Sequence, residues 1–282
     1  FKNGQSMDYR SAHFYMRDVS STLKAVALGD YNISLGQGLT MYNGFSPGKS
    51  AFVMDFKRTG RKIRRHTSNE EIRYLRGAAA TVILSDNVEF TGFISSRNRD
   101  GNGVTIDTDT IFEIVSSLQT SGLHRTQNEI DDKGSVHNFI YGGNINYNGK
   151  RGQVGFNFYN STFDKPVQRN QQLYNQFLWN GDQLGNYSID YSYRIKALSF
   201  FGESAYSSNG GWAHTHSLLM GLSEFVSAGL SYRNFDRKYT TLYPGSFAET
   251  QSTTNESGLY FALDIHPTYN WSITGYADLF QS

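Results

Sequence analysis

The sequence predicts an all-β protein, specifically an antiparallel up-and-down transmembrane β-barrel. Many segments of about ten residues alternate apolar and polar side chains, which is the period of a strand that has one apolar and one polar face. Tight polar turns alternate with long connections, as in outer-membrane barrels. Aromatic residues make up 15% of the 282 residues and charged residues only 18%, and flat aromatic rings favour strands because they pack well on a pleated surface.

Two hairpins are expected before residue 160. The first joins Tyr74 to Leu84 with Val88 to Ser96, and the second joins Asn138 to Tyr147 with Gln153 to Tyr159. The residues between the paired segments are polar or glycine, which is the composition of tight turns.

The C-terminal half shows the alternation most clearly. From Tyr187 to Ile195, one face carries only Tyr and Ile, and the other carries Ser, Asp and Arg. The segments Ser257 to Ile265 and Trp271 to Leu279 alternate in the same way and are joined by a short polar stretch that contains Pro267. We expect these two segments to form a third hairpin.

Longer connections are expected on the opposite side of the barrel, at Arg97 to Thr110, Gln119 to Gly134 and Ser161 to Gly185. We expect a single β-barrel domain over residues 1–282, without a separate soluble domain. Because the sequence begins and ends in strand-like residues, and a barrel needs every strand edge paired, we also expect it to be an incomplete piece of a larger barrel.

Composition excludes several other classes of protein. No stretch approaches the roughly eighteen consecutive apolar residues of a membrane-spanning helix, so a helical membrane protein is excluded. The chain has no Cys, which rules out disulfides and thiolate metal sites. The formal net charge is only +1, so no global field indicates nucleic acid as a partner.

Four runs of sequence resemble a family of Bacteroidota outer-membrane proteins. The runs are Leu28 to Leu39, Tyr74 to Thr81, Ser116 to Thr126 and Tyr276 to Phe280. Full-length members of that family carry helix-hairpin-helix segments ahead of a long β-barrel, and those segments are absent from these 282 residues. The resemblance implies an outer-membrane barrel, and it transfers no functional residue.

The densest charge in the sequence is a basic run with six Lys or Arg in nine residues. Its members are Lys57, Arg58, Arg61, Lys62, Arg64 and Arg65. Such a run could bind the phosphates of nucleic acid, of lipid headgroups or of lipopolysaccharide. The alternative, which we favour, is a solvated loop or a lumen wall in which the run pairs with Asp55, Glu70 and Glu71.

Four charged residues lie on the polar faces of the expected strands: Asp190, Arg194, Asp264 and Asp278. A charge that faces lipid at the centre of the bilayer costs about 2–4 kcal/mol. We therefore expect these four side chains to line the lumen.

No metal, cofactor or catalytic site is predicted. The stretch Asp100 to Asp109 resembles a calcium loop but lacks its turn glycine and its final Glu. His214 and His216 would share one face of a strand, but no third ligand is identifiable, so we expect lumen or loop histidines. Gly36-Gln37-Gly38 lacks the Lys-Ser/Thr of a phosphate loop, and its glycines are expected to kink a strand or to let a neighbour pack closely.

The leading functional hypothesis is a non-enzymatic barrel in the bacterial outer membrane. It would act as a pore or as a membrane component of a transport, secretion or assembly machine. Its expected partners are outer-membrane lipid and lipopolysaccharide, together with other outer-membrane or periplasmic proteins. One alternative is a nucleic-acid-binding or DNA-uptake outer-membrane protein, and a second is a barrel hydrolase.

Overall fold

The structure is a computed structural model of the 282-residue chain. It describes residues 10–44, 46, 48–49, 52–59, 62–68, 70–107, 111–119, 122, 124, 126–169, 172, 175–250, 252–268 and 270–282.

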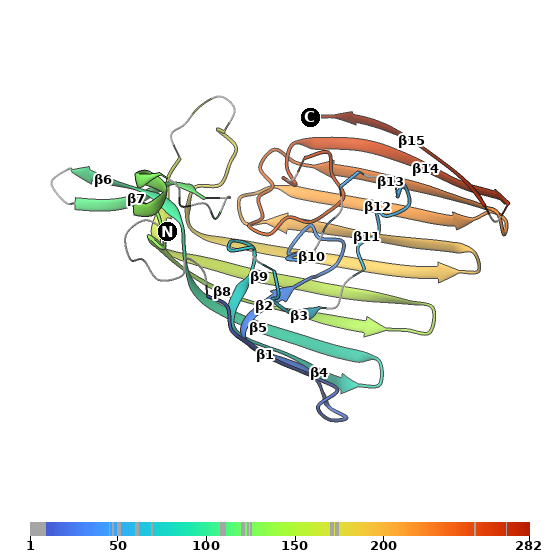
Figure 1. Ribbon diagram of the computed structural model, residues 1–282, viewed down its shortest axis with the longest axis horizontal. Coiled ribbons are helices and arrows are strands. Elements are labelled where there is room, and N and C mark those ends of the chain that lie inside the picture. The colour runs from blue at the N-terminus through green and yellow to red at the C-terminus, as the bar shows by residue number, and fades with distance from the viewer. Residues whose placement is uncertain are drawn as a thin grey trace.

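A single antiparallel sheet organises the molecule, and its main path follows chain order almost throughout (Figure 1). The strands of this path are β1 (His13–Arg17), β2 (Leu23–Ile33), β4 (Leu75–Ser85), β5 (Val88–Arg99), β8 (Val136–Asn148), β9 (Gly152–Val167), β10 (Gly181–Ile195), β11 (Leu198–Ser207), β12 (Trp212–Gly221), β13 (Val226–Phe235), β14 (Glu256–Thr268) and β15 (Trp271–Gln281). Among the described residues, β1 and β15 each have one neighbour on this path, so the sheet is open between them.

Three short strands and a helix lie off this path. They are β3 (Ile63–Arg65), which pairs with β2, the hairpin of β6 (Gly101–Asp107) and β7 (Ile111–Leu118), and α1 (Gln127–Asp131). A capping box at Thr126 and Glu129 begins α1. No helix in the described part of the chain is both long and apolar enough to cross a membrane.

The predicted all-β class, the up-and-down order and the three hairpins are confirmed. The hairpins are β4–β5, β8–β9 and β14–β15. Two expected long connections are shorter than predicted because strands continue into them. β5 runs to Arg99 and is followed by β6, and β9 runs to Val167. Most of the long connections nevertheless lie at one end of the sheet, opposite the short hairpin turns (Figure 1).

The two faces of the sheet differ in chemistry along continuous cross-strand rows. On one face Ile145 lies opposite Phe156, which lies opposite Ile189. On the other face Asn144 lies opposite Asn157, which lies opposite Ser188. The apolar row is exposed and the polar row is buried, and we call these faces the outer and the inner face.

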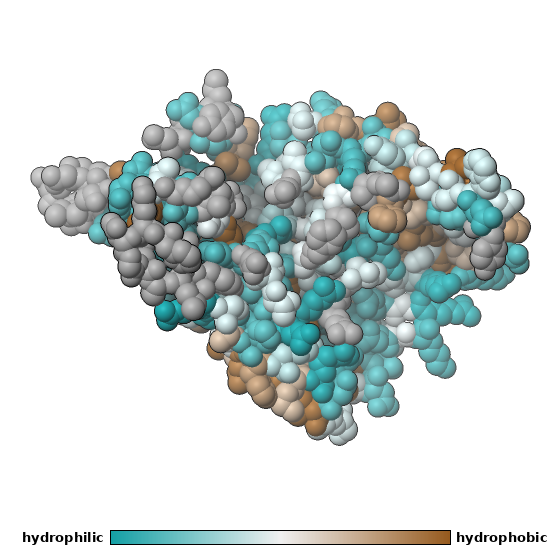
Figure 2. Space-filling model, viewed as in Figure 1, coloured by the Kyte–Doolittle hydropathy of each residue, from teal (hydrophilic) through white to brown (hydrophobic). Residues whose placement is uncertain are grey.

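Two loops cover the inner face on the inside of the curved sheet (Figure 1). Loop 34–62 connects β2 to β3, and loop 236–255 connects β13 to β14. They contact each other through a parallel bridge between Met41 and Tyr243 and through a hydrogen bond from the backbone N–H of Gly245 to the carbonyl of Gly38 (3.0 Å). In Figure 2 hydrophilic residues dominate the middle of this view, and hydrophobic residues gather toward its lower and right margins.

An aromatic cluster anchors loop 34–62 to the inner face. The Phe56 ring lies 5.9 Å from the ring of Phe201 on β11 and 5.7 Å from that of Tyr260 on β14, centre to centre. Phe247 of the second loop packs against the same cluster, 6.0 Å from Phe56. Burial of these rings supplies apolar stabilisation on a face that also carries many polar side chains.

Candidate functional site

Glu203 on β11 fixes the Gly36–Thr40 turn of loop 34–62 to the sheet. Its carboxylate is fully buried and accepts hydrogen bonds from the backbone N–H groups of Gln37 (2.7 Å), Leu39 (3.0 Å) and Thr40 (3.3 Å). The hydroxyls of Thr40 (3.0 Å) and Ser188 (2.6 Å) also donate to it. Successive backbone N–H groups of this kind form a concave anion-binding site, and here a carboxylate of the same chain fills it.

The glycines at 36 and 38 make this geometry accessible. Both have positive φ, +52° for Gly36 and +85° for Gly38, a region that glycine adopts without steric cost. A Cβ at Gly36 would lie 2.7 Å from the Glu203 carboxyl carbon, and one at Gly38 would lie 2.7 Å from the backbone carbon of Gly245. These residues follow β2 and do not kink a strand, so the expected close approach of a neighbour is confirmed and the strand kink is wrong.

Side chains of the second loop hold the other side of the Gly36–Thr40 turn. The hydroxyl of Tyr239 donates to the Leu39 carbonyl (2.9 Å), and that of Thr241 donates to the Thr40 carbonyl (2.6 Å). The turn is therefore bound to the sheet through its N–H groups and to loop 236–255 through its carbonyls.

A polar cavity of about 470 Å³ lies between loop 34–62 and strands β8 to β10. Asn146, Asp190 and Ser192 line it from the sheet, and Lys57 and Lys62 line it from the loop. The Lys57 ammonium donates to the Ser192 hydroxyl (3.2 Å) and lies 4.9 Å from the centre of the Phe201 ring. Burial lowers the pKa of Lys57, and the nearby Arg194 guanidinium adds to this effect.

All four charges predicted to line the lumen lie on the inner face by register. Asp190 is buried and accepts a hydrogen bond from the Asn157 amide (2.7 Å). Arg194 is exposed next to the turn between β10 and β11. Asp264 contacts His266 (3.2 Å) near the turn between β14 and β15, and Asp278 contacts Arg233. That this face lines the lumen of a closed barrel stays a prediction.

The described residues of the basic run divide between the polar cavity and β3. Lys57, Arg58 and Lys62 line the cavity, and Lys62 lies 3.7 Å from a Glu89 carboxylate oxygen. Arg58 is buried and donates to the carbonyl of Gly245 (2.7 Å). Arg64 and Arg65 belong to β3, opposite Asn32 and Tyr31. Arg61 lies outside the described residues, and anion binding by this run stays a prediction.

The two histidines of β12 lie on the outer face, not in the lumen or in a loop. His214 stacks between Trp212 (5.9 Å) and His216 (6.3 Å), and His216 stacks on Tyr191 (5.9 Å), centre to centre. The strand period places them with Trp212 and Leu218, opposite the inward-facing Thr215. Across the described part of the chain, no three His, Asp or Glu side chains are placed to hold a metal ion.

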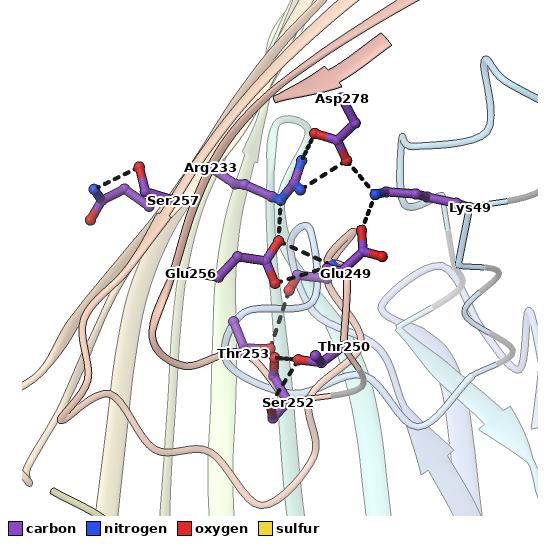
Figure 3. Close-up of polar contacts among 11 residues, drawn as sticks. Lys49, Arg233, Glu249, Thr250, Ser252, Thr253, Glu256, Ser257 and Asp278 are labelled. Carbon is purple, nitrogen blue, oxygen red and sulfur yellow. Dashed lines mark hydrogen bonds and ion pairs between the residues drawn. The ribbon is translucent and has the colours of Figure 1, made fainter. Parts of the chain in front are cut away.

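A buried ionic network ties the last three strands to both loops (Figure 3). Arg233 on β13 is fully buried and donates to Glu256 on β14, and to both carboxylate oxygens of Asp278 on β15 (3.1 and 2.9 Å). Lys49 lies 2.6 Å from Asp278 and also pairs with Glu249. The backbone N–H of Glu249 donates to both oxygens of Glu256 (3.0 and 3.1 Å).

Sequence reasoning identified Asp278 and missed its partner Arg233, as well as Glu203. Both missed residues alternate with outward-facing neighbours, such as Ser204 beside Glu203 and Tyr232 beside Arg233. That alternation could have indicated that they point inward. The loop residues that contact them are distant in sequence and carry no such signal.

Comparison with known proteins leaves the site to be interpreted from its geometry. No known protein-family model matches the chain, and no curated protein sequence matches it.

Proposed function

We propose that the sheet is the wall of an outer-membrane β-barrel whose interior holds loops 34–62 and 236–255. The protein would then be a plugged membrane component of a transport, secretion or assembly machine, not an open pore. Membrane insertion requires every strand edge to be paired. The proposal therefore includes pairing of the free edges of β1 and β15, with each other or with further strands.

The exposed apolar surface of the outer face is the main support for this proposal. One of its rows is apolar on every strand from β5 to β10, through Phe90, Ile145, Phe156 and Ile189. Large side chains on this face stay exposed, such as Ile145 (47%), Ile189 (56%) and Leu263 (41%). Soluble monomers rarely expose a continuous apolar surface of this kind. A lipid environment would cover it.

Aromatic residues near both ends of the strands support the same orientation. Tyr187 and Trp212 lie toward the long connections, while Tyr147, Tyr193 and Trp271 lie toward the short turns. All five are exposed. Outer-membrane barrels carry aromatic girdles at both membrane interfaces.

The bonds that fix loop 34–62 favour a plug over an open channel. Glu203 binds the turn of this loop through its backbone, and Phe56 packs into the inner face. Removing the loop from the interior would leave these buried polar groups without partners, which is costly. Nucleic-acid binding is disfavoured, because Lys57, Arg58 and Lys62 line a cavity of about 470 Å³ on the inner face and do not form an open basic surface.

Single-cysteine labelling tests the placement, since the chain has no Cys of its own. Ile189→Cys and Leu263→Cys would carry a fluorophore on the outer face, and Gln153→Cys would carry it in the cavity. In membranes of cells that produce the protein, a quencher attached to lipid tails should quench the first two labels, and a water-soluble quencher should quench the third. Equal quenching of all three labels by the aqueous reagent would contradict membrane insertion.

Conductance in planar bilayers separates a plug from a pore. The intact protein should show no steady current, and deletion of residues 36–59 should open a conductance. A steady current through the intact protein would contradict the plug.

A further inference from the structure

A second cavity lies at the end of the sheet that bears most of the long connections. It measures about 300 Å³, which is within the range of small-ligand sites, and it shares no lining residue with the first cavity. Arg97 and Arg99, at the end of β5, line its buried part. The exposed residues Arg10 and Lys133 also line it.

Arg99 is a buried cation that forms no direct ion pair within the described residues, although the nearby Asp100 carboxylate attracts it. Its side chain is 7% exposed, and the guanidinium lies 5.6 Å from the centre of the Tyr243 ring. Its Nη1 is buried without a hydrogen bond. Within the described residues, no hydrogen bond or ion pair joins Arg99 to another side chain or to the backbone. A buried charge without a partner is expensive, so this position is explained best by a ligand.

Arg97 is held rigidly beside it. Its Nη1 and Nη2 donate to the carbonyls of Tyr74 (2.8 Å) and Glu71 (3.2 Å), and its guanidinium lies 4.0 Å from the centre of the Tyr74 ring. The remaining Nε is buried without a partner. These contacts satisfy the hydrogen-bonding groups of Arg97 in part but leave its charge uncompensated, because both acceptors are neutral carbonyls.

Among the described residues that line the cavity, no carboxylate forms a direct ion pair with Arg97 or Arg99. Asp100 is engaged by His124 (3.0 Å) and by the backbone N–H of Gly134 (2.8 Å). Arg76 contacts both oxygens of Asp30 (2.6 and 3.0 Å). Among the described residues that line the cavity there are five Lys or Arg side chains and two carboxylates, those of Asp100 and Glu71. Cationic side chains therefore outnumber carboxylates in this part of the lining.

We propose that this cavity binds the phosphate group of a small solute or lipid, with Arg99 as its principal ligand. A phosphate monoester carries a charge of about −1.5 to −2 at neutral pH, so it would be attracted to a lining in which cationic side chains outnumber carboxylates. A guanidinium presents paired N–H donors that fit phosphate oxygens. The site does not depend on membrane insertion, so its test is independent of the function proposed above.

Titration calorimetry of the purified full-length protein in detergent tests the proposal, with inorganic phosphate as the probe. Arg99→Gln should weaken binding by about tenfold or more, because charge-assisted hydrogen bonds contribute about 1.5–3 kcal/mol. The phosphate affinity of Arg99→Lys should lie between those of the unaltered protein and Arg99→Gln, because lysine keeps the charge and loses the paired N–H donors. The exposed turn variant Arg151→Gln is the matched control and should bind as the unaltered protein does.

Thermal unfolding provides a second readout that detects loss of folding. Phosphate should raise the unfolding midpoint of the unaltered protein and of Arg151→Gln, because a ligand of the folded state stabilises it. It should not raise the midpoint of a folded Arg99→Gln. Equal phosphate binding in all variants, or tighter binding of succinate than of phosphate, would overturn the proposal.

Vesicles distinguish the source of the phosphate group. If a lipid headgroup is the ligand, vesicles that contain a phosphorylated lipid should compete with inorganic phosphate, and Arg99→Gln should abolish the competition. If a soluble solute is the ligand, inorganic phosphate should bind and the vesicles should not compete. Absence of binding to both probes would overturn the site.

Discussion

The carboxylate of Glu203 accepts a hydrogen bond from the backbone N–H of Gln37 at 2.7 Å, although the two residues lie 166 positions apart in sequence. Glu203 belongs to the wall of the sheet and Gln37 to a loop that crosses its inner face. This one contact therefore couples the position of the loop to the integrity of the wall.

Glu203→Ala should release loop 34–62 from the inner face. Each buried donor left without an acceptor costs about 1–3 kcal/mol, and Gln37, Leu39 and Thr40 would all lose theirs. We expect faster limited proteolysis within loop 34–62 and a lower unfolding midpoint. Glu203→Gln keeps the shape and one strong acceptor, so its effect should be smaller. The variant Glu224→Gln, at an exposed position, is the control. If loop 34–62 of Glu203→Ala resists proteolysis as well as that of the control, Glu203 does not anchor the loop.

Gly38→Ala should separate the two loops. An added Cβ would meet the backbone of Gly245 at 2.7 Å, and φ of +85° is strained for alanine. The expected loss is about 1–2 kcal/mol from strain alone, with a further loss from the broken contact. Hydrogen exchange at Gly245, whose N–H donates to the Gly38 carbonyl, should accelerate. Gly48→Ala is the matched control, because nothing lies within 4 Å of a Cβ there.

Arg233→Leu should loosen β15 from the sheet. Glu256 would lose its buried cation, while Asp278 would keep Lys49 as an ionic partner. Breaking a buried ion pair by removing one partner costs about 3–5 kcal/mol. Backbone hydrogen exchange in β15 should rise more than that in β10, which the network does not reach. Uniform exchange across both strands would show that Arg233 does not hold the edge.

His66 should make stability fall as the solution is acidified. Burial lowers the pKa of His66 below its ordinary value of 6.5, and the charge of Arg97 contributes in the same direction. The unfolded chain therefore takes up a proton at a higher pH than the folded protein does, so stability is lost as pH falls from 6.5 through the lowered pKa.

Comparing the pH dependence of stability in the unaltered protein and in His66→Gln separates the contribution of His66 from those of the other histidines. Unfolding midpoints at about pH 7.5 and about pH 5.5 bracket the ordinary titration range of histidine. The unaltered protein should lose more stability across this interval than His66→Gln. An equal loss in both proteins would exclude the contribution of His66.

The sequence identified the class of fold because a strand records its two faces locally. In β10, alternation from Tyr187 to Ile195 assigns each side chain to a face without knowledge of its neighbours, and Asp190 duly lies inward. Strand ends were predicted less well. β5 continues to Arg99 because β8 offers it a partner as far as Val136, and this pairing is not visible in β5 itself.

The sequence by itself determined the antiparallel order, the hairpins and the polarity of each face, since period two and turn chemistry act over a few residues. Only the tertiary structure decided that the Gly36–Thr40 turn binds Glu203, that Lys57, Arg58 and Lys62 line one cavity, and that Arg97 and Arg99 line another. Those arrangements depend on contacts between segments more than a hundred residues apart or on different loops. Such contacts are fixed by packing and by the need to satisfy buried polar groups, and no local pattern encodes them.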